Sequence, residues 1–157
     1  MKITLLTMGR NSDKRVEELV ARYVGRLSHY VRFEVRDLPD VRLKGSVTTD
    51  RQKEAEGQSI LATVAPRDFV MLLDERGKEY TSRGFAEMIE RQMATQSRDI
   101  VFVVGGPFGF SKAVYDRADA LISLSRMTLT HEMVRLFFVE QVYRAFTIIR
   151  GESYHHD

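Results

Sequence analysis

The 157-residue chain contains no cysteine. Without a thiol it can form no disulfide, no thiolate metal site and no cysteine-based nucleophile, and this absence fits a cytoplasmic protein. It also lacks an apolar run of the ~20 residues that a membrane-spanning helix needs. The N-terminus enters an apolar, strand-like segment, MKITLLTM, without the pattern of a signal peptide. We therefore expect a globular cytoplasmic protein with no membrane partner.

Charge of one sign is also scarce, because the formal net charge is only +2. This excludes a strongly polybasic nucleic-acid clamp. Ten Lys or Arg and six Asp or Glu nevertheless lie within residues 1–44, out of 24 and 22 in the whole chain. A mildly basic N-terminal third can face phosphate or can simply be a solvated helix face. The sequence leaves both interpretations open.

Several catalytic motifs are missing. The chain has no GK[ST] tail of a phosphate-binding P-loop, no G-x-S-x-G elbow of a serine hydrolase and no H-E-x-x-H zinc motif. Two of its four histidines, His155 and His156, are adjacent, so their side chains point apart and chelate poorly. We expect no metal site.

Apolar periodicity predicts alternating strands and helices. The expected strands are residues 1–8, 31–38, 68–73, 100–104 and 120–124, with turns at 9–12 and 75–78. The expected helices are 14–28, 51–65, 82–96, 112–117 and 131–150. This order predicts an α/β fold with a largely parallel sheet flanked by helices. No repeat or linker divides the chain, so residues 1–157 form one domain.

The last predicted helix is apolar nearly all round, with 12 apolar or aromatic residues among the 19 from His131 to Ile149. Such a helix must be buried on more than one side. It either runs through the core or meets a second subunit. Because a domain of this size has little room to surround a terminal helix, we favour a homodimer.

The chain is organised around a glycine-rich loop in the segment DIVFVVGGPFG, residues 99–109. A buried strand ends there at Gly105 and Gly106, which indicates either positive φ or a close approach of backbone to a ligand. Two other buried strands end at Leu73 and at the segment 124–129. If the three strands are neighbours, their carboxyl ends form one ligand-binding crevice. A purely structural turn is the alternative.

Four stretches of the sequence match a known family. They are MKITLL at residues 1–6, FVVGGPFGFS at 102–111, ISLSRMTLTHEMVR at 122–135 and EQVYRAFTIIRGESYH at 140–155. In this order and at this length, the chain resembles the RlmH family of bacterial ribosomal RNA methyltransferases within the SPOUT superfamily. The resemblance covers essentially the whole chain.

The resemblance implies a SPOUT-type fold with a deep C-terminal trefoil knot, acting as a homodimer. The implied activity is S-adenosylmethionine-dependent methylation of N3 of pseudouridine 1915 in 23S ribosomal RNA, with the assembled ribosome as partner. Methyl transfer from a sulfonium is an in-line displacement in which the protein mainly positions donor and acceptor. The N3 proton must also leave, so a general base would help.

The resemblance also assigns residues. The implied cofactor-binding residues are Leu73, Gly105, Leu124, Ser125, Arg126, Met127, Thr128 and Leu129. His131 is a candidate base by its closeness to this loop, and Tyr154 and His155 are candidates if the tail folds over a partner's cofactor. Candidate RNA contacts are Arg135, Tyr143 and Arg144, although Tyr143 also suits the core.

Two positions depart from the family pattern. Thr130 stands where proline is usual before the helix-opening histidine, and threonine can still cap that helix. His156 stands where Arg or Lys commonly follows the Tyr-His pair.

The sequence leaves two alternatives open: a related knotted methyltransferase acting on another RNA, such as transfer RNA, and a non-catalytic ribosome-binding module.

Overall fold

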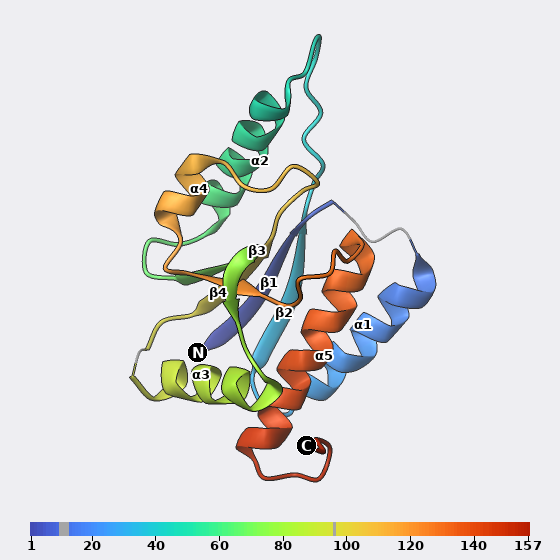
Figure 1. The fold of residues 1–157 in the computed structure, drawn as a ribbon, viewed down its shortest axis with the longest axis vertical. Coiled ribbons are helices and arrows are strands. Elements are labelled where there is room, and N and C mark those ends of the chain that lie inside the picture. Colours follow the sequence, from blue (N-terminus) through green and yellow to red (C-terminus); the bar gives the residue numbers. More distant parts are fainter. Residues whose placement is uncertain (10–12, 96) are drawn as a thin grey trace.

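The computed structural model describes residues 1–9, 13–95 and 97–157, and it has the predicted alternation of strands and helices (Figure 1). The strands are β1 (Lys2–Met8), β2 (Arg32–Leu38), β3 (Phe69–Glu79), β4 (Ile100–Val104) and β5 (Ala120–Ser123). The helices are α1 (Lys14–Leu27), α2 (Thr49–Thr63), α3 (Ser82–Thr95), α4 (Lys112–Arg117) and α5 (His131–Ile149). Residues 10–12 and 96, where part of a turn and a helix end were predicted, lie outside the described residues.

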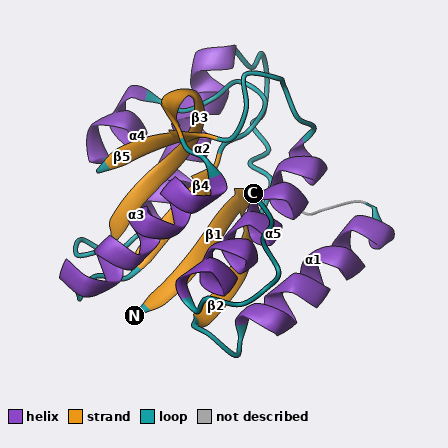
Figure 2. Ribbon diagram, turned by 60° about the horizontal axis from the view of Figure 1, so that its bottom comes forward, coloured by secondary structure: helices purple, strands orange, loops and turns teal. Residues whose placement is uncertain are grey.

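The strands form one five-stranded sheet in the order β2-β1-β4-β3-β5, and the neighbouring strands pair in parallel. Helices cover both faces, with α1, α3 and α5 on one side and α2 and α4 on the other (Figure 2). Strand residues alternate between the two cores: Ile3 and Leu5 face the first helix layer, whereas Leu6 and Met8 face the second. The α/β prediction is confirmed.

Side-chain caps fix the helix starts. Thr130 Oγ1 accepts a hydrogen bond from the Met133 amide at 3.2 Å, so threonine does cap α5. Helix α2 begins two residues before its predicted start because Thr48 Oγ1 accepts from the Arg51 amide at 3.1 Å. Both caps satisfy amides that have no partner within the helix.

Strand β3 is longer than predicted. The composition of residues 75–78 indicated a turn after residue 73, but β3 continues to Glu79. Leu73 and Lys78 both pair with Ile122 of β5, so the residues between them are an insertion in the ladder. A Cβ at Gly77 would lie 2.5 Å from the Ile122 amide nitrogen. The predicted turn is therefore wrong, because a glycine lets this segment pass directly against β5.

Helix α5 lies between α1 and α3 on one face of the sheet (Figure 1). Its inward side chains are fully buried, among them Phe138, Val139 and Val142. Met133 and Phe137 are 44% and 39% exposed. The apolar helix is therefore covered on more than one side, as predicted, but it keeps one uncovered stripe in the single chain.

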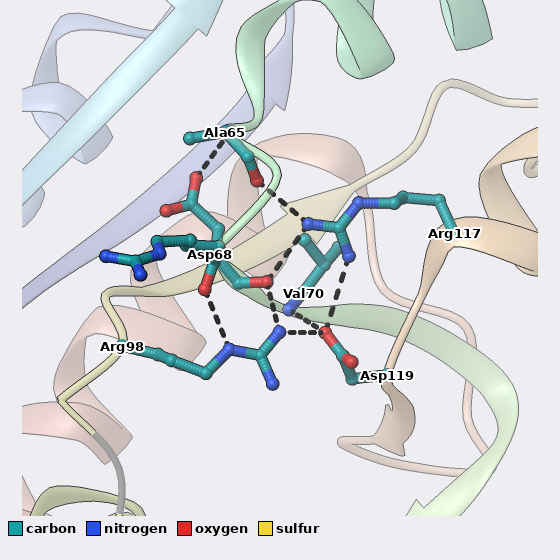
Figure 3. A network of polar contacts seen from close by, with 7 residues as sticks. Ala65, Asp68, Val70, Arg98, Arg117 and Asp119 are labelled. Atoms are coloured by element: carbon teal, nitrogen blue, oxygen red, sulfur yellow. Dashed lines mark hydrogen bonds and ion pairs between the residues drawn. The ribbon is translucent and has the colours of Figure 1, made fainter.

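A polar network ties the amino ends of β3 and β5 together (Figure 3). The Asp119 carboxylate accepts from the Val70 amide at 2.8 Å and from Arg98 at 3.2 Å. Arg117 donates to the Asp68 carbonyl at 3.0 Å. These contacts hold the edge of the sheet opposite the three predicted loops.

None of the described helices is long and apolar enough to cross a membrane.

Candidate functional site

A cavity of about 1020 Å³ opens where β3, β4 and β5 reach their carboxyl ends. Because β3 lies between β4 and β5 in the sheet, the three predicted loops meet there, as open α/β sheets favour. Of the predicted site residues, the following line it: Leu73, Gly105, Leu124, Ser125, Met127, Thr128, Leu129 and His131. The crevice expected from the sequence therefore exists.

Arg126 is the member of the predicted cofactor set that does not line this cavity. Its side chain is 90% exposed, and its Nε lies 3.1 Å from Glu79 Oε1. Such an exposed ion pair contributes little to stability. The segment around it is a tight turn, in which Ser125 Oγ accepts from the Met127 amide at 2.9 Å.

The glycine-rich loop owes its shape to close approaches. Neither Gly105 nor Gly106 has positive φ. A Cβ at Gly105 would lie 3.0 Å from the Phe110 ring, and one at Gly106 would lie 2.5 Å from Glu56 Oε2. Gly109 does have positive φ, +82°, and its amide closes the turn on the Gly106 carbonyl at 3.1 Å. Positive φ is therefore not the reason for the glycine pair, and the observed close approaches are to the chain's own side chains, so a close approach of this backbone to a ligand stays a prediction.

His131 enters the cavity from the first turn of α5. Its Nε2 lies 2.7 Å from Arg135 Nη2. Since a guanidinium can only donate, Nε2 accepts and the ring is neutral with its proton on Nδ1. Burial and the Arg135 charge lower the pKa of His131, against the opposing influence of a hydrogen bond with the Met8 backbone.

Arg135 is buried, with 2% of its surface exposed. Its Nη1 lies 3.3 Å from Asp37 Oδ1, and its Nη2 donates to the backbone carbonyls of Met8 and Gly9. Burial lowers the pKa of the guanidinium, while Asp37 acts in the opposite direction. The predicted RNA contact by Arg135 does not agree with this position, because the side chain faces the ends of β1 and β2 and not the surface.

Tyr154 and His155 belong to the C-terminal tail, which follows the end of α5 opposite to His131. Tyr154 donates to Glu140 Oε1 at 3.0 Å and stacks edge-on against Tyr143 at 4.8 Å. Arg144 lies over the Tyr154 ring and 3.3 Å from His155 Nδ1. The 19 residues of α5 span about 28 Å, so Tyr154 and His155 do not meet the cavity of their own chain.

Burial raises the pKa of Tyr154, and hydrogen bonds with Tyr23 and Glu140 raise it further. The phenol therefore stays protonated and acts as a donor. Tyr143 is half-buried between Tyr23 and Tyr30, at ring distances of 5.8 and 6.1 Å. This aromatic cluster agrees with the core interpretation that the sequence left open for Tyr143.

Sequence reasoning missed polar groups that other elements bring to the cavity. Asp74 accepts from the Tyr115 hydroxyl of α4 and lies 3.4 Å from Arg76 Nε. Burial raises the pKa of Asp74, but the hydrogen bonds from Tyr115 and Arg76 outweigh it and the pKa is lowered. Glu56 of α2 also lines the cavity. Its signal was a carboxylate four residues before Ile60, on the same face of the helix.

In the described part of the chain, no group of three His, Cys, Asp or Glu side chains is placed to hold a metal ion. Four carboxylates and one guanidinium line the cavity, from Asp40, Glu56, Asp74, Glu75 and Arg76. The charged lining is therefore mainly acidic, which favours a ligand with positive charge.

The protein family described as "Predicted SPOUT methyltransferase" matches residues 1–155. The chain belongs to the SPOUT methyltransferase family. Three curated relatives are each named "Ribosomal RNA large subunit methyltransferase H". The one from Porphyromonas gingivalis is 52% identical over the full length of both chains. Those from Christiangramia forsetii and Parabacteroides distasonis are 49% and 46% identical over 99% and 100% of both chains.

These matches confirm the resemblance to the ribosomal RNA large subunit methyltransferase H family within the SPOUT methyltransferases. The four motifs that carried the resemblance map onto the site. Two of them form the cavity loops at residues 102–111 and 122–135, and a third forms the C-terminal half of α5 with the tail.

Proposed function

We propose that the chain methylates N3 of pseudouridine 1915 in 23S ribosomal RNA, with S-adenosylmethionine as methyl donor and the assembled ribosome as substrate. The observation that carries the proposal is the three-loop cavity at the carboxyl ends of β3, β4 and β5 in a member of the SPOUT methyltransferase family. A ribosomal substrate puts the activity in the bacterial cytoplasm.

The chemistry of the cavity suits the proposed donor. The apolar side chains of Leu73, Leu124 and Leu129 offer a surface for a nucleoside base, and the acidic lining suits a sulfonium cation. The residues proposed to hold the donor remain the set from the resemblance, Leu73, Gly105 and Leu124 to Leu129. When bound, the donor supplies an electrophilic methyl group, and the chain has to align the acceptor with it.

His131 is the proposed proton acceptor within the chain's own cavity. Its neutral ring has the right charge state for a base, but its Nε2 is already engaged by Arg135. Proton transfer at Nε2 therefore requires that this hydrogen bond breaks or that Arg135 moves. His155 is the proposed alternative base from a partner subunit, where Tyr154 keeps its proton and would act as a hydrogen-bond donor.

A homodimer would bring Tyr154 and His155 of one subunit close to the cavity of the other. The uncovered stripe of α5 carries Met133 and Phe137, and further along the helix Glu140 and Arg144 are largely covered by Tyr154 and His155 of the tail. If two such stripes pack antiparallel, the Tyr154 end of one α5 lies near the His131 end of the other. Tyr154 and His155 then complete the partner's site, and Arg144 stands beside it as the proposed RNA contact, with Tyr143 packed in the aromatic cluster behind it.

The deep trefoil knot implied by the resemblance is part of this proposal. Residues 74–77 leave the β3–β5 ladder and return to it at the same residue, Ile122. They bulge out of the ladder within β3. Because chains in general do not thread loops, the proposal of a knot rests on the resemblance.

The function is tested in two steps. Calorimetry first measures the binding of S-adenosylmethionine to the purified protein. A methyl-transfer assay then compares intact ribosomes, free ribosomal RNA and transfer RNA. We expect donor binding and methylation of ribosomes alone. No donor binding would favour a non-catalytic ribosome-binding module, and methylation of transfer RNA would favour a related enzyme with another substrate.

A further inference from the structure

Glu56 has a carboxylate that the fold buries but does not satisfy. The residue is 7% exposed, and its Oε2 has no hydrogen-bond partner among the residues that the structure describes. Burying an ionised oxygen without a partner is costly, and native proteins keep such groups rare. The position therefore calls for a physical explanation beyond packing.

The neighbouring residues hold this carboxylate in one orientation. Gln52, one turn earlier on α2, donates from Nε2 to Glu56 Oε1 at 3.0 Å and to the Val41 carbonyl at 3.3 Å. One carboxylate oxygen is therefore fixed by a side chain that is itself anchored. The other oxygen, Oε2, has no partner among the described residues, and Glu56 is one of the residues that line the cavity.

Two glycines allow α2 to bring Glu56 into contact with the glycine-rich loop. A Cβ at Gly57 would lie 2.4 Å from Ser111 Oγ at the start of α4, so Gly57 lets α2 pack tightly against α4. A Cβ at Gly106 would lie 2.5 Å from Glu56 Oε2. The carboxylate thus rests against the backbone of the glycine-rich loop, which is a wall of the proposed donor site.

We propose that Glu56 is a ligand-binding residue of this cavity, whose Oε2 accepts a hydrogen bond from an N–H or O–H group of the bound methyl donor. The inference rests on the proposed function, because it takes the ligand to be a nucleoside sulfonium. Such a donor offers ribose hydroxyls, an adenine amino group and an α-ammonium group. The oxygen left unpaired by the fold is then paired by the ligand, once the glycine-rich loop at Gly106 moves aside from it.

The experiment measures dissociation constants by calorimetry for wild type and Glu56→Gln. The probes are S-adenosylmethionine, S-adenosylhomocysteine, which lacks the sulfonium charge, and 5′-methylthioadenosine, which lacks the amino-acid part. Hydrogen bonds to charged groups predict about 10- to 100-fold weaker binding of S-adenosylmethionine to the variant. A loss shared by all three probes assigns the contact to the nucleoside, and a loss limited to the first two assigns it to the α-ammonium group.

The matched control is Glu54→Gln, the same change of charge at an exposed position of α2, which we expect to bind as wild type does. Thermal unfolding without ligand separates binding from structure. Removing a buried unpaired charge should leave the melting temperature of Glu56→Gln equal or higher. Glu56→Asp, which keeps the charge and shortens the side chain, should also bind the donor more weakly.

Unchanged affinity in both Glu56 variants, in a wild type that binds the donor, would overturn the inference and leave the proposed function standing. A lower melting temperature with unchanged affinity would assign Glu56 a structural role instead. A wild type that binds none of the three probes would overturn the proposed function and this inference with it.

Discussion

His131 is held at the cavity by a hydrogen bond that sets its protonation state. Arg135 donates to Nε2 from a buried position, and Asp37 balances the guanidinium charge. The Thr7 hydroxyl in turn donates to Asp37. One buried arginine thus ties the first turn of α5 to the ends of β1 and β2. We interpret Arg135 as a positioning residue, because it reaches the site only through His131.

The lowered pKa of His131 predicts a pH dependence of stability. Between the folded pKa and the unfolded value of about 6.5, the unfolded chain binds more protons, so the free energy of unfolding falls as the pH falls. The free energy of unfolding falls by at most about 1.4 kcal/mol per pH unit for one titrating group. Urea unfolding between about pH 5 and pH 7 measures it. His131→Gln should show a shallower slope than wild type, and an equal slope would contradict the assignment.

The proposed base predicts an effect on turnover. A positioned base contributes about 10²- to 10⁴-fold to the rate, so His131→Ala or His155→Ala should lower kcat on ribosomes by at least about 10²-fold. His29→Ala, at an exposed position, is the control and should keep wild-type turnover. If both histidine variants kept near-normal kcat, neither histidine would be the base.

At the scale of elements, the pairing of β3 with β5 is what aligns the cavity loops. The ladder is interrupted by residues 74–77 and resumes at Lys78 and Glu79. Gly77 lets that interruption close against β5, since its Cα lies beside the Ile122 backbone. Leu73 and the segment after β5 face the same cavity because of this pairing.

Gly77→Ala should therefore destabilise the protein by about 2–4 kcal/mol, since backbone atoms cannot move aside as a flexible side chain can. Gly25→Ala is the control, because an added Cβ there meets nothing within 4 Å. In the last turn of α1, where its φ is helical, this change should stabilise by up to about 0.5–1 kcal/mol. Urea unfolding measures both free energies, and an equal effect of the two substitutions would contradict this account.

At the scale of the whole molecule, the exposed stripe on α5 predicts self-association. Sedimentation should give a particle of about twice the chain mass of 18.1 kDa. Phe137→Glu puts a charge on the stripe and should yield folded monomers that have lost methyl transfer. Met93→Glu, at a position of α3 that is 42% exposed, should stay dimeric. A monomeric wild type, or a dimeric Phe137→Glu, would contradict the arrangement.

The sequence by itself determined the order of strands and helices, most of their bounds and the three loops of the cavity. These features are local: apolar periodicity defines an element, and a capping side chain such as Thr130 acts within one turn. The position of the site followed from one more rule, that parallel strands end at a common edge. The four motifs then identified the family.

Only the tertiary structure decided which polar groups share that edge. The turn composition of residues 75–78 concealed a strand, because the pairing with β5 depends on a distant residue, Ile122. Arg135 is charged and yet buried, because Asp37 and two backbone carbonyls receive it. Glu56 reaches the cavity through two close approaches at glycines. Each is a contact between segments far apart in the chain, and local sequence carries no measure of such contacts.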